Sequence, residues 1–465
     1  MRPPRSRYRV EYAGGFAAKG GMLFSGRDFW LDFKAPGRYF FADLPPRLED
    51  FLRIGMAIYT VDRIARRNWG PTRSWGRNLL VRVELFDPGF WSSAGVLDAL
   101  QQAVEFVSVD CWDFEFFGVS SGHEWYRPLF SNVIARESPL VCLYSGGLDS
   151  AAGLALRLLD CPDRPLLPVT IKHQPGQNKL IKTQFQHLKN RLGARIDPLV
   201  VHSYMARPDG TKWEPSQRGR SLLFASAGAV AATLSSGTSV EVYESGIGAI
   251  NVPLMAGMTG SKATRGSHPE FFRLMSRLAS LVADREITFL LPFLDRTKGE
   301  MVRSLNEAGL ADIARATVSC ARYPLGYHPY KQCGLCPACL FRRQAMLVGG
   351  IEEPQDTYSF DLFSTPERAG LVPPGKLSYL KAFLMQVAGW ADIETTGRLP
   401  EAVERHLRHT RILKPGESPE ALIALLARNR DEWMAVAAEG RRKGLTWARL
   451  LDRNLVGQGA SYAPA

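Results

Sequence analysis

The sequence contains no long hydrophobic run. Its first residues, Met1 to Arg5, are basic but lead into no apolar stretch of the kind that secretory signals carry. The longest weakly polar stretch, Ser221 to Gly237, is interrupted by serine and glycine and is too short to span a bilayer. These absences predict a cytoplasmic protein with no membrane partner.

The sequence also lacks internal repeats, low-complexity tracts and any dense tract of lysine and arginine. Its formal net charge of +12 permits an anionic partner such as nucleic acid or a nucleotide. Because no dense basic tract is present and arginine far outnumbers lysine, a generally basic protein is the simpler interpretation. Nucleic-acid binding therefore stays open.

Only seven cysteines occur in 465 residues, and four of them lie between Cys320 and Cys339. Such crowding indicates a metal site rather than disulfides in a chain that is not secreted. The spacing Cys333-x-x-Cys336-x-x-Cys339, with Cys320 13 residues upstream, completes a tetrahedral set of four thiolates. Zinc suits this set, and an iron–sulfur cluster is the alternative because it uses the same ligands. We expect the metal to hold residues 317–343 against the catalytic sheet.

A chain of this length is expected to contain two or three domains. Residues 1–135 combine aromatic, strand-like runs (Phe29–Phe33, Leu79–Phe86) with a helical stretch, Leu48–Arg67, and predict a small α+β domain. This part contains no catalytic motif, so we interpret it as a surface for a partner or for a second copy of the chain. Residues 351–465 predict a helical domain, with helices at Pro419–Ala427 and Trp433–Glu439.

Residues 136–350 predict an α/β domain with a parallel sheet. Three apolar runs, each followed by a helical pattern, are typical of buried parallel strands: Pro139–Tyr144, Pro165–Ile171 and Ala194–Val201. The clearest later helices are Arg218–Leu234 and Glu270–Ala283. Ser267 with Glu270, and Thr297 with Glu300, have the spacing of capping boxes, which mark helix starts.

The most informative passage is the loop Ser145-Gly146-Gly147-Leu148-Asp149-Ser150, between an apolar strand and an alanine-rich helix. Its glycines let the backbone turn tightly and present successive N–H groups to a phosphate, and the helix N-terminus adds positive partial charge. Ser145 and Ser150 can donate hydroxyl hydrogen bonds, and Asp149 can hold the Mg²⁺ that neutralises a polyphosphate. The loop therefore predicts ATP binding with pyrophosphate as the leaving group.

Together these residues resemble the QueC family, the 7-cyano-7-deazaguanine synthases of the PP-loop (N-type ATP pyrophosphatase) superfamily. The resemblance covers residues 138–350 and includes the loop, Ile171–Gln177, Gln217–Leu223, Pro269–Phe271 and Thr297–Glu300. Its most specific part is Thr317–Arg342, where Ser319-Cys320 precedes the spacing Cys333-Gly334-x-Cys336-x-x-Cys339-x-x-Arg342. It implies a Rossmann-like, parallel-sheet core beside a zinc site.

The resemblance also implies a reaction. A 7-carboxylate on deazaguanine (7-carboxy-7-deazaguanine) attacks the α-phosphate of ATP and releases pyrophosphate; the acyl-adenylate then reacts with an amine to give an amide. A second adenylation allows dehydration to the nitrile. The enzyme mainly positions the reactants and neutralises charge. The residues implied for catalysis are Asp149, Ser145, Ser150, Lys298 and Arg218. Those implied for ATP binding are Ser145, Gly146, Gly147, Leu148, Asp149, Ser150, Lys172, Gln177 and Gly246. For Lys172, Arg218 and Lys298 the alternative is an ordinary surface charge.

Two departures from the family affect the acceptor. The chain adds about 135 residues before the matched core and about 115 after it, and Glu244–Asn251 matches the family's substrate-binding stretch only loosely. Such extended chains resemble the QueC-like proteins of bacterial antiviral operons (QatC, and those of type IV CBASS), in which the activated deazaguanine is thought to be joined to a partner protein. This resemblance implies a protein acceptor encoded nearby; a homodimer is the alternative use of the terminal segments.

Two other functions stay open. A tRNA-thiolating PP-loop enzyme would need a reactive cysteine, and only Cys111, Cys142 and Cys161 lie outside the cluster. Cys142 falls within an apolar strand and is expected in the core. A non-catalytic, zinc-containing module could bind nucleic acid beside a vestigial nucleotide site. The intact loop at 145–150 argues against a nucleotide site that has lost its function.

Overall fold

The computed structural model describes residues 8–12, 22–24, 29–40, 42–67, 76–119, 139–172, 175–193, 196–205, 214, 217–254, 265–321, 332–370, 372 and 377–448. Its centre is a six-stranded sheet with the order β10-β9-β6-β7-β8-β3. All neighbouring strands are parallel except β3 and β8. The strands are β3 (Phe29–Leu31), β6 (Leu140–Leu143), β7 (Leu166–Lys172), β8 (Leu199–Met205), β9 (Ser239–Val242) and β10 (Thr288–Leu290). The predicted α/β class with a mostly parallel sheet is confirmed.

The chain order of these strands creates a switch point. From β6 the chain moves outward through β7 to β8, then returns to place β9 on the other side of β6. Ligands of open parallel sheets bind where the strand order reverses in this way, at the carboxyl ends of the strands. β8 begins at Leu199, and the first two residues of the expected strand, 194 and 195, lie outside the described residues. Ile196 forms an isolated bridge to Leu166, and Pro198 has no N–H to donate to the sheet.

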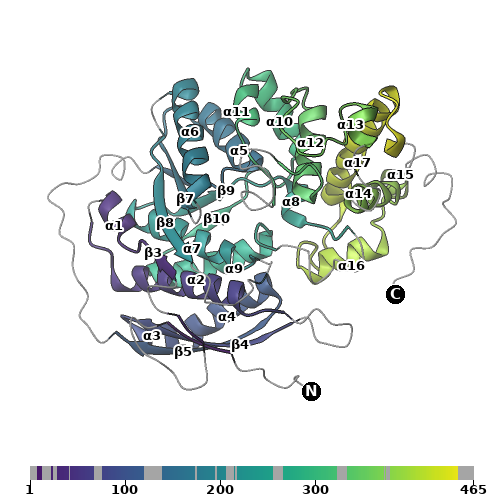
Figure 1. Ribbon diagram of the computed structural model, residues 1–465. Coiled ribbons are helices and arrows are strands. Elements are labelled where there is room, and N and C mark those ends of the chain that lie inside the picture. The colour runs from purple at the N-terminus through teal and green to yellow at the C-terminus, as the bar shows by residue number, and fades with distance from the viewer. Residues whose placement is uncertain are drawn as a thin grey trace.

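Helices cover both faces of this sheet (Figure 1). α5 (Leu148–Asp160) and α6 (Pro175–Leu192) share one buried cluster with β6. α7 (Arg220–Leu234) packs on the opposite face, against β6, β7 and β9, and α9 (Pro269–Ala283) packs against α7 and β10.

A second sheet lies beyond α7 and α9. It is parallel, with the order β2-β1-β4-β5. Its strands are β1 (Tyr8–Tyr12), β2 (Met22–Phe24), β4 (Asn78–Leu85) and β5 (Cys111–Gly118). α2 (Pro46–Ile64) and α4 (Ala94–Ser108) lie between this sheet and the α7–α9 layer, and the shorter α1 (Ala35–Phe40) and α3 (Pro88–Ser92) lie beside β8 and β5.

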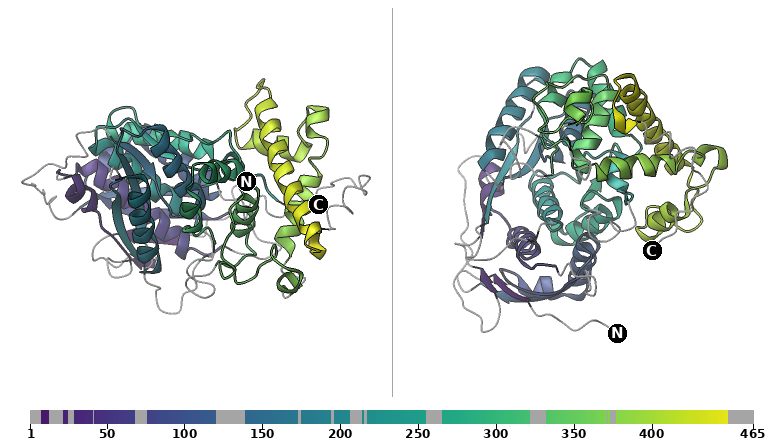
Figure 2. Two further views of the ribbon diagram at one scale, coloured as in Figure 1. Left: turned by 90° about the horizontal axis from the view of Figure 1, so that it is seen from above. Right: turned by 45° about the vertical axis from the view of Figure 1, so that its right-hand side comes forward.

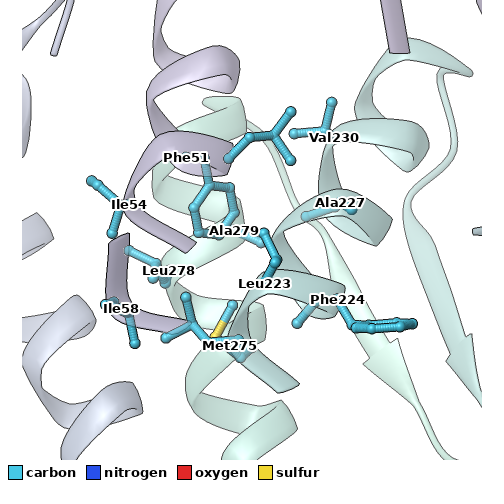
Figure 3. Packing of buried hydrophobic residues seen from close by; sticks show 14 of the residues in the cluster. Phe51, Ile54, Ile58, Leu223, Phe224, Ala227, Val230, Met275, Leu278 and Ala279 are labelled. Carbon is cyan, nitrogen blue, oxygen red and sulfur yellow. The ribbon is translucent and has the colours of Figure 1, made fainter. Parts of the chain in front are cut away.

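The first segment therefore shares its core with the central segment. Phe51, Ile54 and Ile58 of α2 face Leu223 of α7 and Met275 of α9 (Figure 3). β3 pairs with β8 in the central sheet, where Trp30 lies opposite Tyr204. The expected boundary near residue 135 does not separate two cores, because α2 is buried on nearly all sides between two layers.

A buried ionic network fixes the second sheet to the start of α7. Arg77 pairs with Asp62 at 2.6 Å and with Asp110 at 2.5 Å. Arg67 also pairs with Asp110, and Asp62 accepts a hydrogen bond from the Gly219 N–H. These side chains are almost fully buried, so their mutual pairing is what makes their burial tolerable.

The C-terminal segment is helical, as expected, and packs beside α8 (Gly246–Ile250) and α12 (Pro337–Val348) (Figures 1 and 2). Its longest helix, α17 (Glu420–Arg442), is continuous where two helices were expected, since no helix-breaking residue lies between the two predicted stretches. The remaining elements are α10 (Lys298–Glu307), α11 (Ala311–Arg315), α13 (Pro366–Gly370), α14 (Ser378–Ala388), α15 (Ile393–Thr396), α16 (Glu401–His409) and a short 3₁₀ helix, η4 (Thr446–Ala448). No helix among the described residues is long and apolar enough to cross a membrane.

One buried carboxylate joins the C-terminal segment to the central one. Glu432 of α17 accepts hydrogen bonds from the Thr297 hydroxyl, which caps α10, and from the Gln344 amide of α12. Burial raises the pKa of Glu432 to about 7, although both hydrogen bonds act in the opposite direction. Three helices from two segments thus meet at one side chain.

We predict a pH-dependent effect of Glu432→Gln on stability. The unfolded glutamate has a pKa of about 4.3, so between about pH 4.5 and 7 the unfolded wild type loses its proton before the folded protein does. Wild-type stability should therefore fall across this window, by up to about 3 kcal/mol. The Glu432→Gln variant lacks this titration, so its unfolding free energy should increase relative to that of the wild type as the pH rises. Urea unfolding at several pH values measures this, with the exposed Glu401→Gln as control. A difference that does not change with pH would contradict the assignment.

Candidate active site

The loop 145–150 lies at the switch point of the sheet. It follows β6, and Glu244 follows the neighbouring strand β9. Gly146 has a φ of +82°, a conformation that favours glycine. α5 begins at Leu148, so its free N–H groups point out of the sheet edge as at other anion-binding helix starts. The Ser145 and Ser150 hydroxyls lie 3.2 Å apart beside these groups.

A buried amide holds the loop in place. The Gln184 side chain of α6 donates to the Gly146 carbonyl (3.0 Å) and to the Ala316 carbonyl (3.0 Å), and it accepts from the Tyr144 hydroxyl (3.1 Å). The Val318 N–H also approaches the Gly146 carbonyl, at 3.4 Å. The loop backbone is therefore fastened on one side to α6 and on the other to the segment that leads into the cysteine cluster.

Asp149 is paired with a lysine from α10. The Lys298 ammonium lies 2.5 Å from one Asp149 carboxylate oxygen, and both side chains are 13% exposed. The other oxygen accepts from the Ser245 N–H at 3.4 Å. Burial opposes the charged form of Lys298, yet Asp149 and Glu244 hold its pKa above the usual value. Burial, followed by the nearby charge of Asp149, raises the pKa of Glu244 to about 8.

The position of Lys298 follows from the start of α10. Thr297 caps this helix: its hydroxyl accepts from the Glu300 N–H (3.0 Å), and Glu300 accepts from the Thr297 N–H (2.8 Å). The predicted capping box at Thr297 is confirmed. The one expected at Ser267 is wrong, because the cap of α9 is His268, whose Nδ1 accepts from the Glu270 N–H.

The four clustered cysteines come together as predicted. Their sulfur atoms all lie within 4.8 Å of one another, and those of Cys333 and Cys339 are 3.8 Å apart. A tetrahedral zinc site with bonds of about 2.3 Å has edges of about 3.8 Å. A cluster of several irons would spread its thiolate ligands farther, because they bind different irons rather than one shared ion. The four cysteines are buried and fit a single zinc ion that they would surround completely.

The cysteine segment contacts the phosphate loop directly. The Leu148 N–H, at the start of α5, donates to the Ser319 hydroxyl at 3.3 Å, one residue before Cys320. Arg342, fully buried on α12, donates to the Thr317 hydroxyl, the Ala314 carbonyl and the Glu353 carboxylate. Arg342 thus ties α12 to the chain that approaches the loop.

A cavity of about 900 Å³ opens in front of these groups. The phosphate loop, Glu244, Lys298 and Ser319 line one part of it. Residues of α6, α7, α8, α9, α12 and the C-terminal segment also line it. A cavity of this size is within the range of small-molecule sites, and polar and apolar side chains both border it.

The structure brings Lys298 to the loop but places the other predicted residues differently. Arg218 borders the cavity, yet its guanidinium is buried and donates to the Ser108 carbonyl beside Arg67. Burial and the charge of Arg67 lower the pKa of Arg218 to about 10. Lys172 ends β7, the next strand along, and burial and Lys182 lower its pKa.

The two remaining predicted residues lie on helices. Gln177 is in the first turn of α6, and its side chain lies outside the described part of the chain. Gly246 begins α8 and packs closely: a Cβ there would lie 2.1 Å from the Leu294 carbonyl oxygen and 2.7 Å from Leu425. The nucleotide-binding roles of both residues stay predictions.

Several residues at the site were given no role by the sequence. Gln184 has no distinctive spacing, and Glu244 and Ser319 were noted only as parts of stretches that resemble the family, so only the folded chain brings these three side chains to the loop. Arg220 lies two residues after Arg218 and borders the cavity at intermediate exposure, stacked over Phe224. The sequence could have pointed to Arg220 through the predicted helix start: residues two positions apart on a helix face different directions, so Arg218 and Arg220 cannot share one environment.

Residues 253–348, about a fifth of the chain, match the family model described as queuosine biosynthesis protein QueC. No curated protein matches the chain. The matched stretch contains Lys298, the four cysteines and Arg342 but not the loop 145–150. The match supports a QueC-like family and suggests an ATP-using role related to 7-deazaguanine.

We predict that the purified protein contains about one zinc per chain and that Cys336→Ser lowers both stability and activity. Loss of one thiolate weakens zinc binding, and zinc stabilises the segment that carries Ser319. The melting temperature should fall by about 10 °C. Metal analysis and thermal unfolding measure this, with Cys161→Ser, outside the cluster, as control. A zinc-free protein, or a stable and active Cys336→Ser variant, would refute the site.

We predict that Asp149→Asn reduces AMP formation by about 100-fold or more while the fold is retained. Asp149 is largely buried against Lys298. The amide keeps the shape and the hydrogen bond to Ser245, whereas alanine would leave Lys298 without its partner. Chromatography of AMP measures the effect, and Asp160→Asn at the exposed end of α5 is the control. Near-native turnover in Asp149→Asn would show that Asp149 only begins a helix.

Proposed function

We propose that this protein uses ATP to adenylate the carboxylate of a 7-deazaguanine and then transfers the acyl group to an amine. One observation carries the proposal: Lys298, from the stretch that matches the QueC model, pairs with Asp149 of the Gly-Gly loop at the switch point. The phosphate-binding feature and the family-matched feature thus form one site. A PP-loop core explains both.

In the proposed reaction a carboxylate oxygen attacks the α-phosphorus, and the bond to the β-phosphate breaks. The loop N–H groups and the hydroxyls of Ser145 and Ser150 would bind the leaving pyrophosphate. Mg²⁺, held by Asp149, would supply the remaining counter-charge. Lys298 would balance the carboxylates around it and orient Asp149. Ser145, Ser150, Asp149 and Lys298 lie around the loop, so in this proposal catalysis would be mainly positioning.

In the second step an amine attacks the carbonyl carbon, the bond to the adenylate oxygen breaks, and AMP leaves. Ammonia as the amine would give an amide, and a second adenylation of that amide would allow its dehydration to the nitrile. A protein amine would give a conjugate, as the likeness to the defence-operon proteins implies.

A thiolating enzyme is less well supported. Cys142 is fully buried in β6, where burial raises its thiol pKa. Cys111 begins β5 in the second sheet, and Cys161 follows α5 at the end away from the loop. None of these three borders the cavity within the described residues.

We predict ATP–pyrophosphate exchange that depends on 7-carboxy-7-deazaguanine. Reversible adenylation returns labelled pyrophosphate to ATP only when the carboxylate is present. Exchange should be lost without that substrate. Exchange that is independent of the carboxylate, or formation of ADP in place of AMP, would point to another ATP-dependent reaction.

We predict that the acceptor is a protein amine. The enzyme, ATP and 7-carboxy-7-deazaguanine would be mixed with the proteins encoded beside it and examined by intact mass spectrometry. A covalent mass increase on a neighbour supports conjugation, and free amide or nitrile alone contradicts it. The whole chain is used, because β3 and α2 belong to the common core and residues 1–135 cannot be removed cleanly.

A further inference from the structure

The cavity extends from the phosphate loop to the C-terminal segment. Tyr379, Phe383 and Gln386 of α14 border it, followed by Trp390 just beyond the helix. Their spacing of four, three and four residues places them on one face of the helix. Met385, on the other side, is 60% exposed. α14 therefore turns one defined face toward the cavity.

This face is held rigidly. The Phe383 ring stacks on Trp433 of α17 at 5.1 Å and meets Phe341 of α12 edge-on at 4.6 Å. The Gln386 amide donates to the Pro253 carbonyl at 3.0 Å. Through Glu432, α17 is in turn fixed to the start of α10. These contacts hold the cavity-facing side of α14 at a fixed distance from Lys298 and the loop.

The position of the family-matched stretch indicates which ligand reaches this side of α14. Between the loop and α14 the cavity is bordered by Ser319, Ala338 and Phe341, all within residues 253–348. On another side it is bordered by Leu180 and Ile181 of α6, outside that stretch. Other residues of the stretch, Gly266, Ser267 and Phe272, border the cavity near α7 and α9, whereas none of the α6 residues belongs to it. We therefore place the acyl substrate on the side away from α6, where α14 supplies aromatic and amide side chains, and the nucleoside of ATP beside α6.

We propose that α14 forms the subsite for the planar ring of the acyl substrate, with Tyr379 and Gln386 determining its specificity. This inference rests on the proposed function. Aromatic side chains stack on planar heterocycles, and an amide can hydrogen-bond a polar ring edge. The ring end then faces α14 and the carboxylate faces the loop, where it meets the α-phosphate. α14 lies beyond the family-matched stretch, so this subsite belongs to the extension that the chain adds.

The test is to compare Tyr379→Ala and Gln386→Ala with Met385→Ala, the matched control on the outer face of α14. In the exchange assay the first two should raise the KM for 7-carboxy-7-deazaguanine about 10-fold and leave the KM for ATP unchanged. Calorimetric titration with the same compound, without ATP, should show the same loss of affinity. Circular dichroism establishes that each variant is folded.

Unchanged affinity for the compound in both folded variants would overturn the inference, as would a selective rise in the KM for ATP. The proposed function fails separately. If the wild type binds 7-carboxy-7-deazaguanine but shows no exchange, adenylation is wrong, and the titrations still decide whether α14 holds the ring. If the wild type does not bind the compound at all, both are wrong.

Discussion

The ion pair between Lys298 and Asp149 is the contact on which the candidate site depends. It joins residues 149 positions apart, and it places a cation from the QueC-like stretch against the loop after β6. Burying the ammonium is costly, and the Asp149 carboxylate offsets that cost. The capping box at Thr297 fixes the backbone beside Lys298, and Glu432 fixes Thr297 in turn. A helix of the C-terminal segment therefore acts on the phosphate loop through a short series of direct contacts.

The cysteine cluster acts on the same loop from the other side. Four thiolates would surround a zinc ion completely and leave no open position for chemistry, so the site would act on the loop only by holding it in position. Ser319 accepts from the Leu148 N–H at the start of α5, and Gln184 binds both the loop and the chain that approaches the cluster. A zinc ion bound there would support the loop without taking part in the reaction. The same geometry explains how one cavity can be bordered by both the central and the C-terminal segments of the chain.

The sequence could predict what depends on local pattern. The loop, the strands β6 and β7, the cysteine set and the cap of α10 each follow from neighbouring residues, and the structure contains them. It could not predict contacts made across the fold. In the sequence Gln184 looks like any polar residue of a helix, and its hydrogen bond to Gly146 appears only in the fold. The pairing of β3 with β8 could not be predicted either, because β3 has only three residues. Arg218 and Arg220 look alike in sequence and both border the cavity, and only packing buries the Arg218 guanidinium against the Ser108 carbonyl and leaves Arg220 partly exposed.

In the proposed function a carboxylate oxygen attacks the α-phosphate of ATP at this loop. The most direct test uses 7-carboxy-7-deazaguanine labelled with ¹⁸O in its carboxylate, followed by mass spectrometry of the AMP formed. Attack by the carboxylate leaves one labelled oxygen on AMP when the amine displaces it. AMP that carries one ¹⁸O is the predicted result. AMP without the label, formed at the same rate as the acylated product, would contradict the account.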